Sequence, residues 1–292
     1  MYGGTTAFID HSRRQPREHG PKMENMTTHV RLPQWLDTLI FDDLGARYCC
    51  TRQDMTVIDW DRDAVLGYLG TYFPRSYAEA YCLYTAYFER HAATWQGRER
   101  LTVFDFGCGT GGEVIGLLST MAECLTGVRE VEINAFDGNP HALRLFERVC
   151  DEFATHAQLH VRKRIFPFTV DDFYDLSVLG GVLDSTFDLI LVSKAVCEFV
   201  TKDQFEQQNA YAHLARFLLP RLGADGMMLL TDVTSYNRTS QEWLPRMMDA
   251  GLAKAGGHVA ARNEGFNQAF TVTHSRRAGD VSKIAWRVLT KP

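Results

Sequence analysis

The sequence predicts an α/β protein with a large, mostly parallel sheet, and two observations lead to that prediction. After residue 97, short apolar runs of about four to eight residues alternate with helical stretches, which is typical of strand–helix–strand units in a sheet covered on both faces. The first run ends in a glycine-rich loop at residues 107–112, and open parallel sheets bind ligands at such loops. A chain of 292 residues is long enough for one such domain with an added cap.

Seven strands are expected in this sheet. The five parallel strands are placed, in chain order, at residues 101–106, 131–136, 159–164, 187–193 and 227–232. Two further runs, residues 270–274 and 284–289, are joined by the polar segment 276–280. They predict an antiparallel hairpin that closes one edge of the sheet.

Three helices are expected between these strands. One begins at residue 113, directly after the glycine-rich loop, and another covers residues 203–219. The third begins at Pro140 with Asn139 as its N-cap, because Asn accepts hydrogen bonds from the first turn and Pro fits that turn without needing its missing N–H group.

The chain divides into three predicted segments. Residues 1–28 mix Gly, Thr, Arg, His and Pro without the apolar segment of a secretory signal, so we expect a disordered tail. Residues 29–98 form a helical N-terminal cap, in which aromatic side chains such as Tyr68 and Tyr72 recur at helical spacing. Residues 99–292 are expected to form the ligand-binding domain.

Charge and composition exclude several classes of protein. Lys and Arg total 31 against 36 Asp and Glu, a net charge of -5, so no overall positive field attracts nucleic acid. Away from the tail, one dense basic cluster surrounds His274 and consists of Arg276, Arg277, Lys283 and Arg287. It fits either a solvated hairpin or a site that binds a phosphate or carboxylate. No apolar run approaches the roughly 20 residues of a membrane span, so we expect no membrane insertion.

The seven cysteines are scattered and contain no C-x-x-C pair. This pattern argues against both a disulfide framework and a zinc ribbon. We therefore expect no metal site and a reducing, cytoplasmic location.

The glycine-rich loop satisfies two templates. Gly107, Gly109 and Gly112 match G-x-G-x-x-G, which is typical of dinucleotide sites, whereas Asp105 to Gly111 reads D-x-G-x-G-x-G. A carboxylate at Asp105 favours a ligand with an ammonium group over the anionic pyrophosphate of a nicotinamide dinucleotide. S-adenosylmethionine is such a ligand, and a carboxylate at the end of the second strand, Asp137, suits ribose hydroxyls in either case.

The chain resembles the class I S-adenosylmethionine-dependent methyltransferases in three features. These are the segment Phe104-Asp105-Phe106-Gly107-Cys108-Gly109-Thr110-Gly111, the carboxylate of Asp137 and the closing hairpin. The resemblance covers residues 100–292 and implies a Rossmann-like, seven-stranded sheet with S-adenosyl-L-methionine as cofactor. It implies that Gly107, Gly109 and Gly111 line the methionine and ribose. Asp105 would lie near the amino group and Asp137 would hold the ribose hydroxyls.

The resemblance implies further cofactor contacts. A carboxylate after the third strand would meet the adenine amino group, and Asp171 and Asp172 both fit. A cap helix would cover the cofactor, with Arg75 or Tyr77 meeting its carboxylate. The remaining expected residues of the cofactor site adjoin these motifs: Cys108, which is expected to pack, Gly138, Asn139 and Ser193.

Candidates for the chemistry follow the fourth and fifth strands. Glu198 suits a general base, Lys194 suits orientation of an acidic substrate group, and Asp232 ends the fifth strand in an equivalent position. All three also fit ordinary residues on a helix or strand rim. The segment lacks the Asp/Asn-Pro-Pro-Tyr/Phe signature of amino-directed methyltransferases and the Pro-Cys nucleophile of the cytosine C5 class.

Two functions are therefore weighed. The leading one is a methyltransferase that acts on a small molecule or a natural-product intermediate, which the acidic charge and aromatic cap favour. The alternative is an RNA- or ribosome-associated assembly factor with little or no catalysis. Residues 68–111 and 274–287 also resemble the methyltransferase-like proteins of small ribosomal subunit assembly, but this chain lacks their clustered cysteines. The acceptor atom and the oligomeric state stay open.

Overall fold

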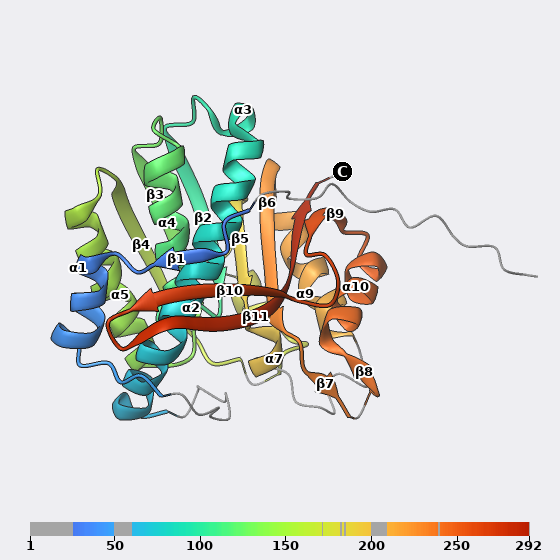
Figure 1. Cartoon of the computed structure of the whole chain (residues 1–292). Helices are drawn as coiled ribbons and strands as arrows, with labels where there is room; N and C mark the ends of the chain where they lie inside the picture. The colour runs from blue at the N-terminus through green and yellow to red at the C-terminus, as the bar shows by residue number, and fades with distance from the viewer. Residues whose placement is uncertain are drawn as a thin grey trace, which may run out of the picture.

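A nine-stranded sheet forms the centre of the protein (Figure 1). The computed structural model describes residues 26–49, 60–170, 172–181, 183, 185–199, 209–238 and 240–291. Its strands follow the order β1-β10-β11-β6-β5-β2-β3-β4, and β9 pairs with β11. Nearly all of the predicted tail lies outside the described residues, so the prediction for residues 1–28 is not tested.

All five predicted parallel strands are present. They are β2 (Arg100–Phe106), β3 (Glu130–Asp137), β4 (His160–Pro167), β5 (Phe187–Ser193) and β6 (Leu222–Val233). The ladders between β2 and β3, β3 and β4, β2 and β5, and β5 and β6 are all parallel. Their carboxyl ends therefore lie along one edge of the sheet, where the predicted site residues lie.

The closing hairpin is longer than the sequence predicts. β10 (Gln268–His274) pairs antiparallel with β11 (Arg277–Thr290), and β11 pairs antiparallel with β6. The segment 276–280, expected as a connection, mostly belongs to β11, because His274 pairs directly with Arg277 across a two-residue turn. Gly279 has a φ of 65° within this strand, a conformation that glycine adopts easily.

Two strands of this sheet were not predicted. β1 (His29–Arg31) adds to β10 in parallel, and β9 (His258–Arg262) pairs antiparallel with β11. In Figure 1, β1 (blue) lies beside β10 (red), although about 240 residues separate them in the chain. The seven predicted strands thus make up most of the sheet, and the α/β Rossmann-like fold is confirmed.

Helices cover both faces of the sheet. α2 (Arg62–Arg90), α4 (Gly112–Cys124) and α5 (Pro140–His156) share one apolar core with Val103, whereas α9 (Ala210–Leu218) and α10 (Leu244–Lys254) share the other core with Phe104. Successive residues of β2 therefore face opposite cores, as a strand buried on both sides requires. None of the described helices is both long and apolar enough to cross a membrane. The part of the predicted 203–219 helix before residue 209 lies outside the described residues.

The remaining elements are short. They are α1 (Gln34–Thr38), a π-helical turn (Leu39–Asp43), α3 (Ala92–Trp95), α6 (Ser177–Gly180), α7 (Val196–Phe199), a 3-10 turn (Leu219–Arg221), β7 (Tyr236–Asn237) and β8 (Glu242–Trp243).

The long helix α2 is packed at backbone contact against α4. A Cβ atom added to Gly112 would lie 2.6 Å from the carbonyl oxygen of Phe73, and one added to Gly116 would lie 2.5 Å from that of Tyr77. Only glycine permits such an approach at these two positions. The predicted cap helix therefore lies directly on the helix that follows the glycine-rich loop.

Candidate functional site

The glycine-rich loop joins β2 to α4 in a conformation that requires glycine. Gly107, Gly109 and Gly111 have φ values of 74°, 48° and 84°, in the left-handed region that other residues rarely adopt. The amide of Gly107 donates a 2.9 Å hydrogen bond to the carbonyl of Phe136 at the end of β3. A Cβ atom on Gly111 would also lie 2.4 Å from the ring of Phe146. The loop is thus held closely against β3 and α5.

Asp105 lies beneath this loop as a buried carboxyl group without a partner. Its exposed fraction is 0%, and neither carboxylate oxygen has a hydrogen-bond partner among the described residues. Burial raises the pKa of Asp105 well above its usual value, and the negative charges of Glu113 and Asp137 raise it further. A buried polar group without a partner destabilises the fold, so this carboxyl group fits a ligand that brings a cation.

Asp137 ends β3 and holds the loop. One carboxylate oxygen accepts from the amide of Gly109 at 2.8 Å, and the other accepts from the amide of Asn139 at 2.8 Å. Burial raises the pKa of Asp137, although these backbone donors lower it in part. Because each carboxylate oxygen has a second lone pair, these contacts leave room for ribose hydroxyls.

Asn139 is the N-cap of α5, as predicted. Its side-chain oxygen accepts from the amides of His141 at 2.9 Å and Ala142 at 3.0 Å. Its side-chain nitrogen donates to the carbonyl of Trp60 at 3.0 Å. Both ends of the side chain are therefore bound to protein, and the segment before α2 is attached to the end of β3.

Lys194 lies directly after β5 and points to α2. Its exposed fraction is 7%, its φ is 55°, and its ammonium group donates to Glu79 at 2.8 Å and to Ser76 at 2.9 Å. Burial would lower the pKa of Lys194, but the negative charges of Glu79, Glu113 and Glu198 raise it. The acidic group that Lys194 meets in the structure belongs to the protein itself.

Glu198, in α7, is half-buried at the same edge. Burial raises the pKa of its carboxyl group well above the usual value, Asp137 and Asp232 raise it further, and Lys194 opposes them. Glu113, in the first turn of α4, is 8% exposed, and burial raises its pKa to about 8. Several acidic side chains therefore face one another where the strands end.

Asp232, in β6, is fully buried beside this group. Its carboxylate accepts hydrogen bonds from the Tyr211 hydroxyl at 2.8 Å and from the Val233 amide at 2.7 Å. Burial raises the pKa of Asp232, although these donors lower it in part. Unlike Asp105, it has partners within the protein.

The two alternative adenine contacts have different positions. Asp172 is exposed and accepts from the amide of Tyr174 at 2.9 Å, in a turn after β4. Asp171 lies outside the described residues. The choice between them therefore stays open.

Three smaller predicted residues are packed among backbone and side chains. Cys108 is 1% exposed, as expected for a packing residue, and burial raises the pKa of its thiol well above its usual value. The hydroxyl of Ser193 lies 3.1 Å from that of Thr231. A Cβ atom on Gly138 would lie 3.3 Å from the carbonyl oxygen of Phe168.

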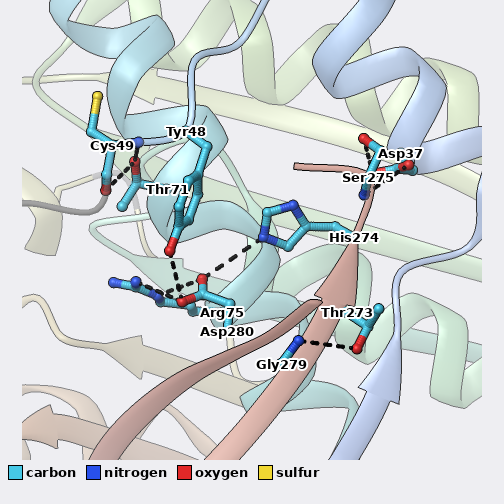
Figure 2. Close-up of polar contacts among 10 residues, drawn as sticks. All are labelled: Asp37, Tyr48, Cys49, Thr71, Arg75, Thr273, His274, Ser275, Gly279 and Asp280. Carbon is cyan, nitrogen blue, oxygen red and sulfur yellow. Dashed lines mark hydrogen bonds and ion pairs between the residues drawn. The ribbon is translucent and has the colours of Figure 1, made fainter. Parts of the chain in front are cut away.

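Arg75 and Tyr77 are both held by partners away from the loop. Arg75 donates through Nε and Nη2, each at 2.8 Å, to the carboxylate of Asp280 in β11 (Figure 2). Tyr77 is 2% exposed, and its hydroxyl hydrogen-bonds Ser119 in α4. The structure therefore does not bring either residue to the glycine-rich loop.

Three members of the basic cluster expected around His274 are held by carboxylates, whereas Arg277 and Lys283 form no ion pair among the described residues. The His274 side chain is buried, its Nε2 atom lies 3.8 Å from the Asp280 carboxylate (Figure 2), and its ring stacks on Phe41 at 5.0 Å. Arg276 and Arg287 pair with acidic residues at 2.8 Å and 2.6 Å. These side chains face carboxylates rather than a shared anion site.

Sequence reasoning did not assign Glu113, Glu79 or Tyr68 to the site. Glu113 had the clearest signal, because it directly follows the last loop glycine. Glu79 and Tyr68 lie on α2, and nothing in their spacing shows which face of that helix meets the loop.

The fold is Rossmann-like, with a glycine-rich loop after β2 and carboxylates near the ends of two neighbouring strands, β2 and β3. No known protein family and no curated protein matches the sequence.

Several solved methyltransferase structures are similar to the chain. The trans-methyltransferase CalH, in complex with SAH, has 12% identity and a TM-score of 0.47, covering 77% of this chain and 60% of that one. The DszA carbon methyltransferase has 14% identity and a TM-score of 0.44, covering 75% and 57%. The rRNA methyltransferase AviRa from Streptomyces viridochromogenes has 18% identity and a TM-score of 0.35, covering 71% and 84%. The chain spans less than two thirds of the length of the first two.

Proposed function

We propose that the protein is an S-adenosylmethionine-dependent methyltransferase that acts on a small molecule or a natural-product intermediate. The observation that supports this most directly is Asp105, whose two buried carboxylate oxygens have no partner among the described residues. An ammonium group would satisfy both oxygens, whereas a pyrophosphate would add negative charge beside Asp105, Glu113 and Asp137. The residues present therefore fit an amino-acid-bearing nucleoside better than a dinucleotide.

In this proposal the chain's own groups bind and orient the cofactor. Gly107, Gly109 and Gly111 leave the backbone open to the ligand, Asp105 takes the ammonium group, and Asp137 takes the ribose hydroxyls. When bound, S-adenosylmethionine supplies an activated methyl group, so the protein mainly has to align an acceptor and remove its proton.

Glu198 is the proposed general base. Burial and the charge of Asp137 raise the pKa of its carboxyl group, so the ionised form takes up a proton more readily than an ordinary glutamate does. Lys194 is proposed as a positioning residue rather than a substrate contact, because Glu79 and Ser76 hold its ammonium group. Asp232 accepts a hydrogen bond from Tyr211, and we propose that it helps to hold α7 in place.

A reducing location is part of the same proposal. All six described cysteines are free thiols, which supports the cytoplasm. RNA association is the lesser alternative, because His274, Arg276 and Arg287 in the basic cluster face carboxylates. RNA binding that weakens steeply with added salt, in a protein that binds no S-adenosylmethionine, would reverse this order.

Calorimetry with three ligands tests the cofactor assignment. We expect the purified protein to bind S-adenosylmethionine and S-adenosylhomocysteine and not to bind NAD. Asp105→Asn keeps the shape of the side chain and removes its charge, so the affinity for S-adenosylhomocysteine should fall by about tenfold to a hundredfold. Asp225→Asn, which changes an exposed side chain near the start of β6, is the control for loss of a carboxylate. Tight NAD binding, or unchanged affinity in Asp105→Asn, would contradict the assignment.

A further inference from the structure

Tyr68, on α2, lies directly against the glycine-rich loop. A Cβ atom on Gly109 would lie 3.5 Å from both Cε1 and the hydroxyl oxygen of Tyr68, so the outer edge of the ring borders the space beside Gly109 that a side chain would fill. The ring is held from the sides by Trp60, at 5.8 Å between centroids, and by Tyr72, at 5.0 Å. Its position over Gly109 is therefore determined by its aromatic neighbours.

The hydroxyl group of Tyr68 lies among carboxylates from three different elements. Burial raises the pKa of this phenol well above its usual value, and the nearby charges of Glu198, Glu113 and Asp137 raise it further. The group therefore stays a neutral O–H at physiological pH. Among the described residues this hydroxyl has no hydrogen-bond partner.

The surroundings of Tyr68 come from several elements. The charges of Asp137, at the end of β3, and of Glu198, in α7, both act on its hydroxyl, and its ring edge lies beside Gly109. Under the proposed function these residues belong to the cofactor side and the acceptor side of the site, so Tyr68 lies where the two sides meet.

The charges around Tyr68 indicate which kind of ligand group is favoured beside its hydroxyl. Lys194 is the basic side chain buried among these acids, and it is already paired with Glu79. Glu113, Asp137 and Glu198 have no such cation among the described residues. A positively charged group beside Tyr68 would thus gain both from the carboxylates and from the lone pairs of the phenol oxygen.

We propose that Tyr68 is a specificity-determining residue that contacts the reactive end of the cofactor and favours its cationic sulfonium form over the neutral thioether product. This inference rests on the proposed function. It assigns Tyr68 a contact through its oxygen and its ring edge beside Gly109. A preference for the charged methyl donor would also help the neutral product to leave.

The test compares two ligands rather than turnover. Calorimetry measures the dissociation constants of S-adenosylmethionine and S-adenosylhomocysteine for the wild type, Tyr68→Phe and Tyr68→Ala. Tyr81→Phe is the matched control, because it removes a hydroxyl from the same helix that bonds Glu123 and not the site. We expect the wild type to bind the sulfonium ligand more tightly than the thioether.

Tyr68→Phe keeps the ring and loses the oxygen, so the preference should fall by about threefold to tenfold while thioether affinity changes less than about twofold. Tyr68→Ala should lower the affinity for both ligands, and Tyr81→Phe should have the same two dissociation constants as the wild type. An unchanged preference in Tyr68→Phe, with both ligands still bound by the wild type, overturns the inference alone. If the wild type binds neither ligand, the proposed function itself fails.

Discussion

The ammonium group of Lys194 lies 2.8 Å from the carboxylate of Glu79, and this buried ion pair joins the end of β5 to the middle of α2. Ser76, one turn earlier on α2, accepts a second hydrogen bond from Lys194 at 2.9 Å. Because Glu198 follows Lys194 by only four residues, the pair fixes the distance between α2 and the proposed base. The covering helix and the edge that carries the proposed base are thus held as one unit.

Removing one partner of this pair should destabilise the fold. Lys194→Met leaves the Glu79 carboxylate buried without a cation, and we expect a loss of about 3–5 kcal/mol in the free energy of unfolding. Urea denaturation measures this. The double variant Lys194→Met/Glu79→Met should recover most of the loss, because no uncompensated charge stays buried. A single variant as stable as the wild type would show that the pair is open to water.

The contribution of the Asp280 carboxylate to the stability of the fold should decrease in acid. Burial would raise the pKa of Asp280, but its contacts with His274, Arg75 and Tyr48 outweigh burial and lower it to about 2. The folded pKa lies below the unfolded one, so the stabilisation is present above about pH 4 and is lost as the pH falls toward 2. The difference in unfolding free energy between the wild type and Asp280→Asn should therefore shrink over that range. A difference that stays constant would exclude a charge effect.

Cofactor affinity should depend on pH through Glu113. Burial raises the pKa of its carboxyl group to about 8, so the free protein holds a proton there at pH 7. A cationic ligand favours the ionised form, which means that binding releases this proton and strengthens as the pH rises from 6 to 8. Calorimetry in buffers of different ionisation enthalpy measures the release. Glu113→Gln should show a smaller release and a flatter pH profile, whereas equal release in both proteins would assign the proton to another group.

The titratable and charged groups that face Glu113 are Glu79, Asp105, Asp137, Glu198, Lys194 and Tyr68. The same raised pKa predicts that, without ligand, the contribution of Glu113 to stability is full below about pH 4.5. It is lost as the pH rises through about 8.

A branched side chain in the glycine-rich loop should abolish ligand binding while the fold persists. Gly109→Val places a β-branched residue at a φ of 48°, against Tyr68 and where the cofactor approaches the backbone. Gly265→Val is the matched control, because Gly265 has a φ of 63° and no atom near its added Cβ. Both variants should lose similar stability by thermal unfolding monitored by circular dichroism. Only Gly109→Val should lose the ability to bind S-adenosylhomocysteine. If Gly109→Val retained this affinity, the loop would be only a turn and not part of a binding site.

The strands that could be predicted are those with a local pattern. β2, β3, β5 and β6 are apolar runs of ordinary length, and their positions follow from the sequence within a few residues. β1 is a three-residue edge strand without such a run, and it exists because β10 offers it a partner about 240 residues away. The first residues of β11 likewise form a strand because they pair with β10 across a short turn, rather than because they are hydrophobic.

By itself the sequence determined the loop, its glycines and the two carboxylates that end β2 and β3. These depend on local causes: left-handed backbone at Gly107, Gly109 and Gly111, and the position of a residue at the end of a strand. The tertiary structure alone decided how α2 meets that loop. Arg75 turns to Asp280 rather than to the loop, and Tyr68 lies over Gly109. Such partners are chosen by the packing of surfaces far apart in the chain, because a charged or aromatic side chain on a helix has the same local pattern whichever neighbour it meets.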